Sequence, residues 1–143
     1  MQVFIVGSPL DTAMDLDRRR LRKQVIECGQ IYEALTGKSK WSNHPAVLQY
    51  KGHEHWLKLY TYCLAWYYEK GGFIRALLYS DEALNFTPPF HTQEYFDQMK
   101  RRLYTKNPEH YKQWESLGCS DENWYWSPTE NKFIKYVNGK RIE

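Results

Sequence analysis

Residues 16–35 read LDRRRLRKQVIECGQIYEAL, and this stretch is the strongest structural signal in the chain. Apolar side chains recur along it at the spacing of one face of an α-helix. The residues of this face are Leu21, Val25, Cys28, Tyr32 and Leu35. Gly37 favours a helix end, because glycine tolerates the left-handed conformation of a C-cap. The stretch therefore predicts a long amphipathic helix that packs on a core.

The rest of the chain is also expected to be mainly helical. The same periodicity predicts helices over His53–Lys70, Phe73–Leu84 and Thr92–Tyr104. Asn107-Pro108 is typical of a helix start, with Asn as the N-cap and Pro in the first turn, and we expect that helix to stop at Gly118.

After Gly118 we expect an irregular aromatic tail. Lys132–Val137 alternates in polarity and predicts a short strand. Asn138-Gly139 is a turn signal, but few residues follow it, so no full hairpin is expected. The predicted fold class is all-α, as one compact domain over residues 1–143 with about four to five helices.

The composition excludes several classes of protein. The chain has 143 residues, of which 26% are charged, and no apolar run approaches the roughly 20 residues of a membrane-spanning helix. VFIV at residues 3–6 is too short for a signal-peptide core and lacks a basic lead, so we expect a cytoplasmic protein. Three widely spaced cysteines predict reduced thiols. We expect a monomer without a cofactor.

Aromatic content and a basic run favour a nucleic-acid partner. Aromatic residues make up 17% of the chain, although its net charge is only +3. The basic run consists of Arg18, Arg19, Arg20, Arg22 and Lys23. Such side chains neutralise phosphates and release counterions, so the run is a candidate phosphate clamp. A solvated helix face is the alternative interpretation.

Glu27 is the candidate catalytic carboxylate. At 100° per residue it shares a helix row with Arg20, Gln24 and Ile31, and this row flanks the apolar face. A carboxylate at a core edge is partly buried, which suits it to acid or base chemistry. An ordinary boundary glutamate paired with an arginine is the alternative.

His44 is a second candidate, in the sequence Asn43-His44-Pro45. Proline holds the residue before it in an extended conformation, and an imidazole titrates near neutral pH. A loop histidine bonded to the backbone is the alternative. His53 and His55 lie two residues apart and point in different directions on a helix, so no metal site is expected.

Several short segments together carry a family resemblance. They are residues 16–31, WSNHPAV at 41–47, EKGGF at 69–73, KNPEHY at 106–111 after His91 and Leu103, and WYWSP at 124–128. Their order and spacing resemble the pyrimidine-dimer DNA glycosylase family, of the phage endonuclease V type in its bacterial and phage branch.

The resemblance implies a mainly helical domain that excises cyclobutane pyrimidine dimers from DNA. In this family a free N-terminal amine attacks the deoxyribose C1′ and forms a Schiff base, and the strand breaks by β-elimination. The essential carboxylate falls on Glu27. Gln2 is too large for the usual removal of methionine, so the nucleophile would be the amine of Met1. Ile26 and Gln30 stand where the characterised phage enzyme has arginines.

The leading hypothesis is therefore a DNA glycosylase with abasic-site lyase activity on damaged duplex DNA. Its candidate catalytic residues are Glu27, Met1 and His44. Its candidate DNA-binding residues are Arg19, Arg20, Arg22, Lys23, Gln24, Lys100, Arg101 and Tyr111. Two alternatives stay open: a catalytically silent DNA-binding module, and an enzyme that acts on a small nucleoside or nucleotide in a pocket too narrow for a duplex.

Overall fold

The chain forms two compact units, Met1–Pro88 and Pro89–Glu143. The computed structural model describes residues 1–37, 40–69 and 71–142. The predicted helix end at Lys70 therefore lies outside the described residues. No helix of the described residues is both long enough and apolar enough to cross a membrane.

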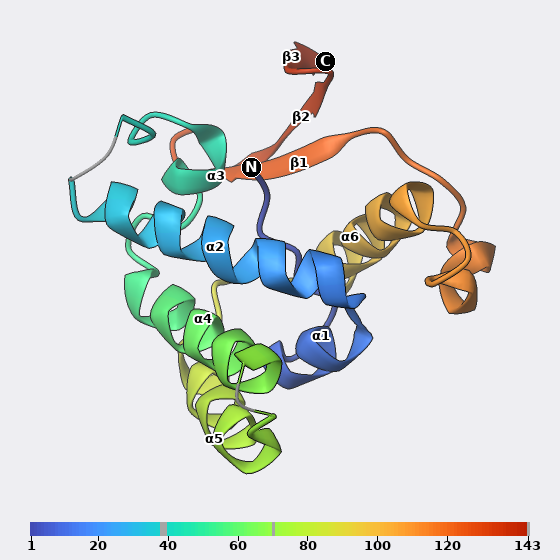
Figure 1. Cartoon of the computed structure of the whole chain (residues 1–143). Coiled ribbons are helices and arrows are strands. Elements are labelled where there is room, and N and C mark those ends of the chain that lie inside the picture. Colours follow the sequence, from blue (N-terminus) through green and yellow to red (C-terminus); the bar gives the residue numbers. More distant parts are fainter. Residues whose placement is uncertain (38–39, 70, 143) are drawn as a thin grey trace. The chain divides into compact units, whose positions relative to one another are not determined.

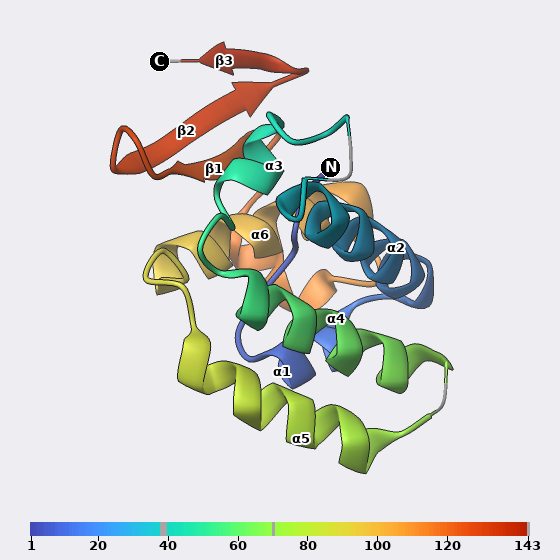
Figure 2. The ribbon, with the colours of Figure 1, turned by 90° about the vertical axis from the view of Figure 1, so that its left-hand side faces the viewer.

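Helices build the first unit (Figure 1). They are α1 (Pro9–Asp15), α2 (Arg18–Leu35), α3 (Pro45–Leu48), α4 (Glu54–Glu69), α5 (Phe73–Ala83) and the 3-10 helix η1 (Leu84–Phe86). Helix α4 contacts α1, α2 and α5 and lies between α2 and α5 in both views (Figures 1 and 2). Its central place explains why apolar side chains occupy a wide arc of its surface. The buried members of that arc are Trp56, Leu57, Leu59, Tyr60, Cys63 and Leu64.

The long helix predicted over residues 16–35 is confirmed as α2, with its start at Arg18 rather than Leu16. A further helix, α1, comes just before it and was not predicted. Ser8 caps α1 by accepting a hydrogen bond from the Asp11 N–H, and Pro9 occupies its first turn. Seven residues are too few to show helical periodicity, so only these capping signals marked α1.

The second unit combines helices with a sheet. It contains α6 (Gln93–Lys106), the 3-10 helix η2 (Lys112–Leu117), and the strands β1 (Asn123–Ser127), β2 (Lys132–Val137) and β3 (Lys140–Ile142). The strands form an antiparallel sheet in the order β1-β2-β3. Stacked rings join α6 to this sheet: the ring centroid of Tyr95 lies 5.3 Å from that of Phe133. The aromatic residues of the chain's end therefore form a core.

The all-α prediction is wrong, because the predicted irregular tail is this sheet. The short strand predicted over Lys132–Val137 is confirmed as β2. The expectation that no full hairpin follows Asn138-Gly139 is also wrong. Both turn residues have positive φ angles, 51° and 77°, as a type I′ turn requires, and Val137 pairs directly with Lys140.

The helix predicted from Asn107-Pro108 to Gly118 is only partly present. Asn107 does act as a cap, since its Oδ1 accepts a hydrogen bond from the His110 N–H at 3.2 Å. The segment after it is a turn followed by the 3-10 helix η2 rather than an α-helix. The stop at Gly118 is confirmed, because this residue has a φ of 87° and is the C-cap.

Candidate active site at the N-terminus

The first residues of the chain lie extended and buried in the first unit. Val3 and Ile5 are fully buried, and Phe4 and Val6 are at most 6% exposed. Side chains satisfy the backbone groups of this segment. The Val6 N–H donates to Thr12 Oγ1 at 3.1 Å, and the Tyr60 hydroxyl donates to the Phe4 carbonyl. The N-terminal segment is therefore anchored along its length, and the N-terminus lies beside α3 (Figures 1 and 2).

Gln24 on α2 holds the same segment nearer its start. Its Oε1 accepts a hydrogen bond from the Phe4 N–H at 2.9 Å, and its Nε2 donates to the Gln2 carbonyl at 2.7 Å. The side chain is 2% exposed. Gln24 was predicted to bind DNA, but its amide is buried against the protein's own backbone. That prediction is not carried further.

Glu27 lies one turn further along α2, at the edge of the core. Its side chain is 15% exposed, as the helix-row argument predicted for a boundary carboxylate. Oε2 accepts a hydrogen bond from the Gln2 N–H at 3.2 Å, and Oε1 lies 3.7 Å from the exposed Lys23 Nζ. The Gln2 N–H belongs to the peptide that directly follows Met1. The Glu27 carboxylate is therefore one peptide away from the N-terminal amine.

His44 faces the same region from the N-cap of α3. Its Nδ1 accepts a hydrogen bond from the Ala46 N–H at 3.0 Å, so a neutral ring carries its proton on Nε2. Burial lowers the pKa of His44, and the charge of the Met1 amine lowers it further, while the Glu27 carboxylate opposes both. These charges act because the three groups lie close together. Glu27 thus lies beside the peptide that follows Met1, and His44 lies within electrostatic range of both groups.

The cysteine thiols are unsuited to act as nucleophiles at this site. Burial raises the pKa of the Cys28 thiol, and the neighbouring Glu27 charge adds to this effect. Burial raises the pKa of Cys63 to about 12. Cys28, Cys63 and Cys119 are all free cysteines in the structure. Among the described residues, no group of three or more His, Cys, Asp or Glu side chains could hold a metal ion.

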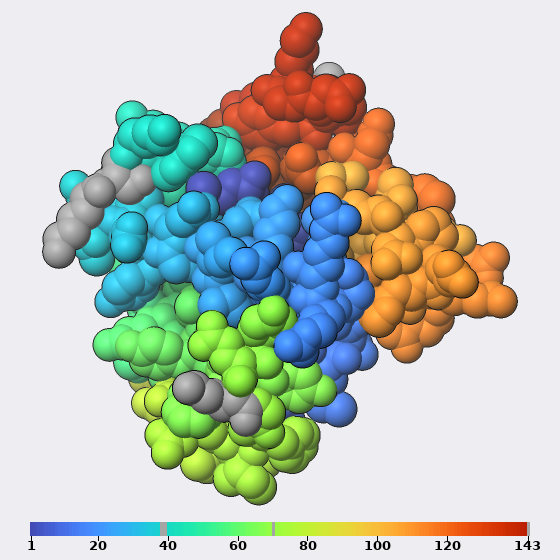
Figure 3. Space-filling model, in the orientation of Figure 1, coloured from blue at the N-terminus to red at the C-terminus, as the bar shows by residue number. Residues whose placement is uncertain are grey.

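The predicted basic run lies at the start of α2. Arg18, Arg19, Arg22 and Lys23 are exposed, and Arg20 is half-buried on the row that leads to Glu27. Figure 3 shows α2, in blue, crossing an open face of the first unit. The Arg18 guanidinium stacks over the Tyr68 ring, with 4.4 Å between Cζ and the ring centroid. The exposed basic side chains at the start of α2 can therefore contact an anionic ligand that approaches Glu27.

The predicted DNA-binding residues of the second unit have structural partners there. Tyr111 is fully buried and stacks on Trp114, so its ring has no free face for a base, and that prediction is not carried further. Arg101 Nε donates to the Leu117 carbonyl at 3.0 Å and ties α6 to η2. Lys100 is half-buried and lies 4.0 Å from Asp97.

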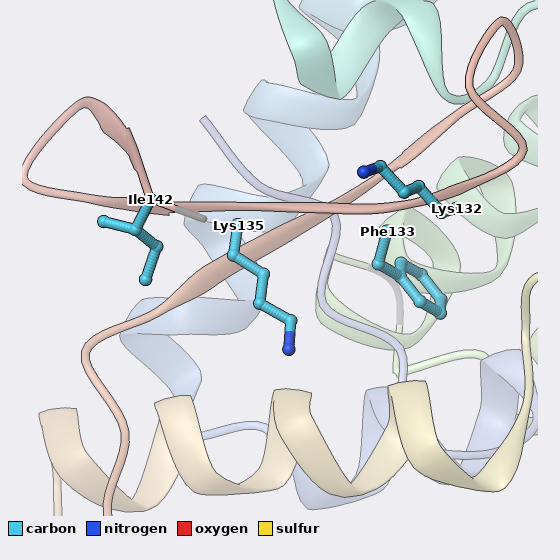
Figure 4. A pocket seen from close by; sticks show the side chains of 4 residues that line it. All are labelled: Lys132, Phe133, Lys135 and Ile142. Carbon is cyan, nitrogen blue, oxygen red and sulfur yellow. The ribbon is translucent and has the colours of Figure 1, made fainter.

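A hollow of about 410 Å³ in the second unit was not predicted from the sequence. Lys132, Phe133, Lys135 and Ile142 line it, and Phe133 and Lys135 extend from β2 on the side of α6 (Figure 4). The Lys135 ammonium lies 4.5 Å from the centroid of the Trp124 ring. Recognising this hollow requires the strand register, which the sequence alone did not supply.

A carboxylate, an N-terminal amine and an imidazole beside a basic helix form a candidate site for an anionic ligand. The family model for pyrimidine dimer DNA glycosylase matches residues 1–75. The chain therefore belongs to the pyrimidine dimer DNA glycosylase family, as the resemblance predicted. Searches of curated proteins and of solved structures found no match.

The family match covers the whole candidate site. Met1, Glu27, His44 and the basic run of α2 all lie within residues 1–75. The resembling segments at 106–111 and 124–128 lie outside this range. Family membership gives this chain the role of a DNA repair glycosylase, with DNA as its substrate.

Proposed function

We propose that this DNA repair glycosylase excises cyclobutane pyrimidine dimers and cuts the abasic strand through the amine of Met1. The observation that carries the proposal is the 3.2 Å hydrogen bond from the Gln2 N–H to Glu27 Oε2. It places a carboxylate beside the peptide that bears the amine. His44, whose pKa responds to both charges, completes the group.

In the first step, the neutral amine adds at C1′ of the damaged nucleotide. The bond from C1′ to the base nitrogen breaks, and the base leaves with the electron pair and takes up a proton. Positive charge develops at the sugar during this step, and the Glu27 carboxylate stabilises it. Loss of a proton from nitrogen leaves the sugar bound to Met1.

In the second step, the sugar ring opens and the strand is cut. The C1′–O4′ bond breaks, O4′ takes up a proton, and a protonated Schiff base forms at C1′. Removal of a proton from C2′ then expels the phosphate at C3′ by β-elimination. His44 is neutral with its N–H on Nε2, so it is the proposed hydrogen-bond donor to the leaving base or to O4′, while water supplies the proton that each takes up.

The basic residues at the start of α2 are the proposed phosphate contacts. They are Arg19, Arg20, Arg22 and Lys23. Lys100 and Arg101 are proposed contacts on the second unit. Phosphate contacts hold the duplex in register, and a base or dimer must then leave the stack to reach the amine.

A duplex with one thymine dimer and a labelled strand tests the proposal. Cleavage without alkali is expected at the dimer and not in a matched undamaged duplex. Cleavage that requires hot alkali would show glycosylase activity alone and would contradict the lyase step. Salt-sensitive binding with neither product would indicate a DNA-binding module.

A further inference from the structure

Gln24 is an unusual residue for the buried face of a helix. Its side chain is 2% exposed and is surrounded by apolar residues of α2, which include Leu21 and Cys28 at 4% and 0% exposure. Buried amides are retained where every polar atom has a partner. Here two partners belong to the backbone of the N-terminal segment, and the Cys28 thiol also donates to Gln24 Oε1 at 3.7 Å.

We propose that Gln24 is a positioning residue that sets the register of the N-terminal segment and so places the Met1 amine beside Glu27. This inference rests on the proposed role of the amine. Gln24 itself does not touch the substrate. It acts through Gln2 and Phe4, and its contribution is the location of the nucleophile.

The hydrogen bonds explain how one side chain fixes a register. Gln24 presents an acceptor and a donor together, as a neighbouring β-strand would, and pairs them with the Phe4 N–H and the Gln2 carbonyl. A slip by one residue turns every side chain of an extended segment to the opposite face. Because Val3, Phe4, Ile5 and Val6 are all buried, a slip would also put each side chain into packing space that fits a neighbour of different size. The segment therefore docks in one register.

Gln24 and Glu27 both anchor the segment close to the amine, at Gln2. Two further side-chain anchors act later in the segment, from Tyr60 at Phe4 and from Thr12 at Val6. Loss of the Gln24 amide removes two hydrogen bonds that tie Gln2 and Phe4 to α2. Loss of the Thr12 hydroxyl bond leaves the start of the segment in place. Thr12→Val is therefore the matched control.

The test uses Gln24→Met, which keeps length and apolar volume but lacks the amide. It is made with the native N-terminus and with one additional glycine before Met1, released by protease cleavage of a leader. The measured quantity is the rate of borohydride trapping on a duplex with an abasic site. Dissociation constants and melting temperatures are measured alongside, for the wild type and Thr12→Val as well.

In the wild type and in Thr12→Val, the extra glycine moves the amine by one residue, roughly 3.5 Å, and should slow trapping by about 100-fold. Gln24→Met should slow trapping by at least about 10-fold with DNA binding unchanged within about 3-fold. In this variant the extra glycine should have less than about a 3-fold effect, because Gln24 no longer holds the residues before Phe4 in one position. If Gln24 only stabilised the fold, the extra glycine would slow trapping by the same factor in Gln24→Met as in the wild type.

Trapping by Gln24→Met at the wild-type rate, or an equal glycine penalty in both backgrounds, would overturn the inference. If Gln24→Met shows no cooperative melting, Gln24→Glu replaces it, since this variant keeps an acceptor for the Phe4 N–H and loses the donor to Gln2. A separate readout needs no activity: the rate at which an acylating reagent modifies the Met1 amine should rise in the variant. An unchanged acylation rate would also contradict the inference. A changed acylation rate with no wild-type trapping would overturn the proposed function and leave the positioning role standing.

Discussion

Replacing Glu27 with glutamine removes a charge and little else. A glutamine oxygen can still accept the Gln2 N–H, which Glu27 Oε2 now accepts at 3.2 Å. The side chain keeps its length at the core edge. The substitution therefore separates the electrostatic role of the carboxylate from its contribution to the fold.

The expected effects on rate and stability differ in size. Loss of an acid–base group slows the chemical step by about 10²- to 10⁴-fold, or about 3–5 kcal/mol of activation free energy. Stability should fall by only about 1–2 kcal/mol, because a charge-assisted hydrogen bond becomes a neutral one and the ion pair with the exposed Lys23 is lost. The pKa of His44 should fall further, since the Glu27 charge raises it.

Single-turnover cleavage of an abasic duplex measures the rate, and fluorescence anisotropy measures binding. Glu27→Gln should bind DNA as the wild type does and cleave it at least about 100-fold more slowly. NMR titration of the histidines gives the shift at His44. Cleavage within about threefold of the wild-type rate would refute the role of the carboxylate. A loss of DNA binding equal to the loss of rate would indicate a binding residue instead.

Arg19→Ala and Arg22→Ala should each make the slope of log Kd against log salt shallower by about 1 in anisotropy titrations, and an unchanged slope would exclude a phosphate contact. The pKa of His44 is lowered in the folded protein, so the free energy of unfolding should fall as the pH drops below the ordinary histidine range. His44→Asn removes the imidazole but keeps an N-cap acceptor for α3. Urea unfolding at about pH 5 and 7 should therefore show a smaller loss of unfolding free energy for His44→Asn than for the wild type. Gly139→Ala should destabilise the second unit by about 1 kcal/mol, seen as a lower Tm, because Gly139 has a φ of 77°; an unchanged Tm would contradict this.

The long helices could be predicted because their apolar periodicity is local. The spacing from Leu21 to Leu35 identified α2, and Gly37 marked its end with a φ of 81°. The exact buried face was harder to predict. Gln24 and Ile31 are buried on α2, although both were assigned to the flanking row.

The burial of Gln24 was not predicted because it depends on a contact between segments that are distant in sequence. Gln24 is polar, and periodicity assigns polar residues to a boundary. Its burial depends on the backbone of residues 2 and 4, and no local pattern in α2 reveals that partner. Glu27 could be placed at the core edge from the sequence, because its position depends only on helix geometry.

The sheet of the second unit was not predicted because it depends on the pairing of strands, which local sequence patterns do not show. Trp124 and Trp126 alternate with Tyr125 along β1. A run of five residues is too short to predict a strand unless the strand that pairs with it is known. The register aligns Trp126 with Phe133, and these rings pack at a centroid separation of 5.1 Å. Aromatic residues that suggested nucleic-acid stacking are thus largely used in packing.

Borohydride trapping tests the central claim most directly. The protein is incubated with labelled duplexes that carry a thymine dimer, an abasic site or no lesion, and the adduct is digested for peptide mapping. We expect a covalent adduct on both damaged duplexes, with the mass increase on the Met1 amine. An adduct mapped to a lysine, or strand cleavage with no adduct, would contradict it.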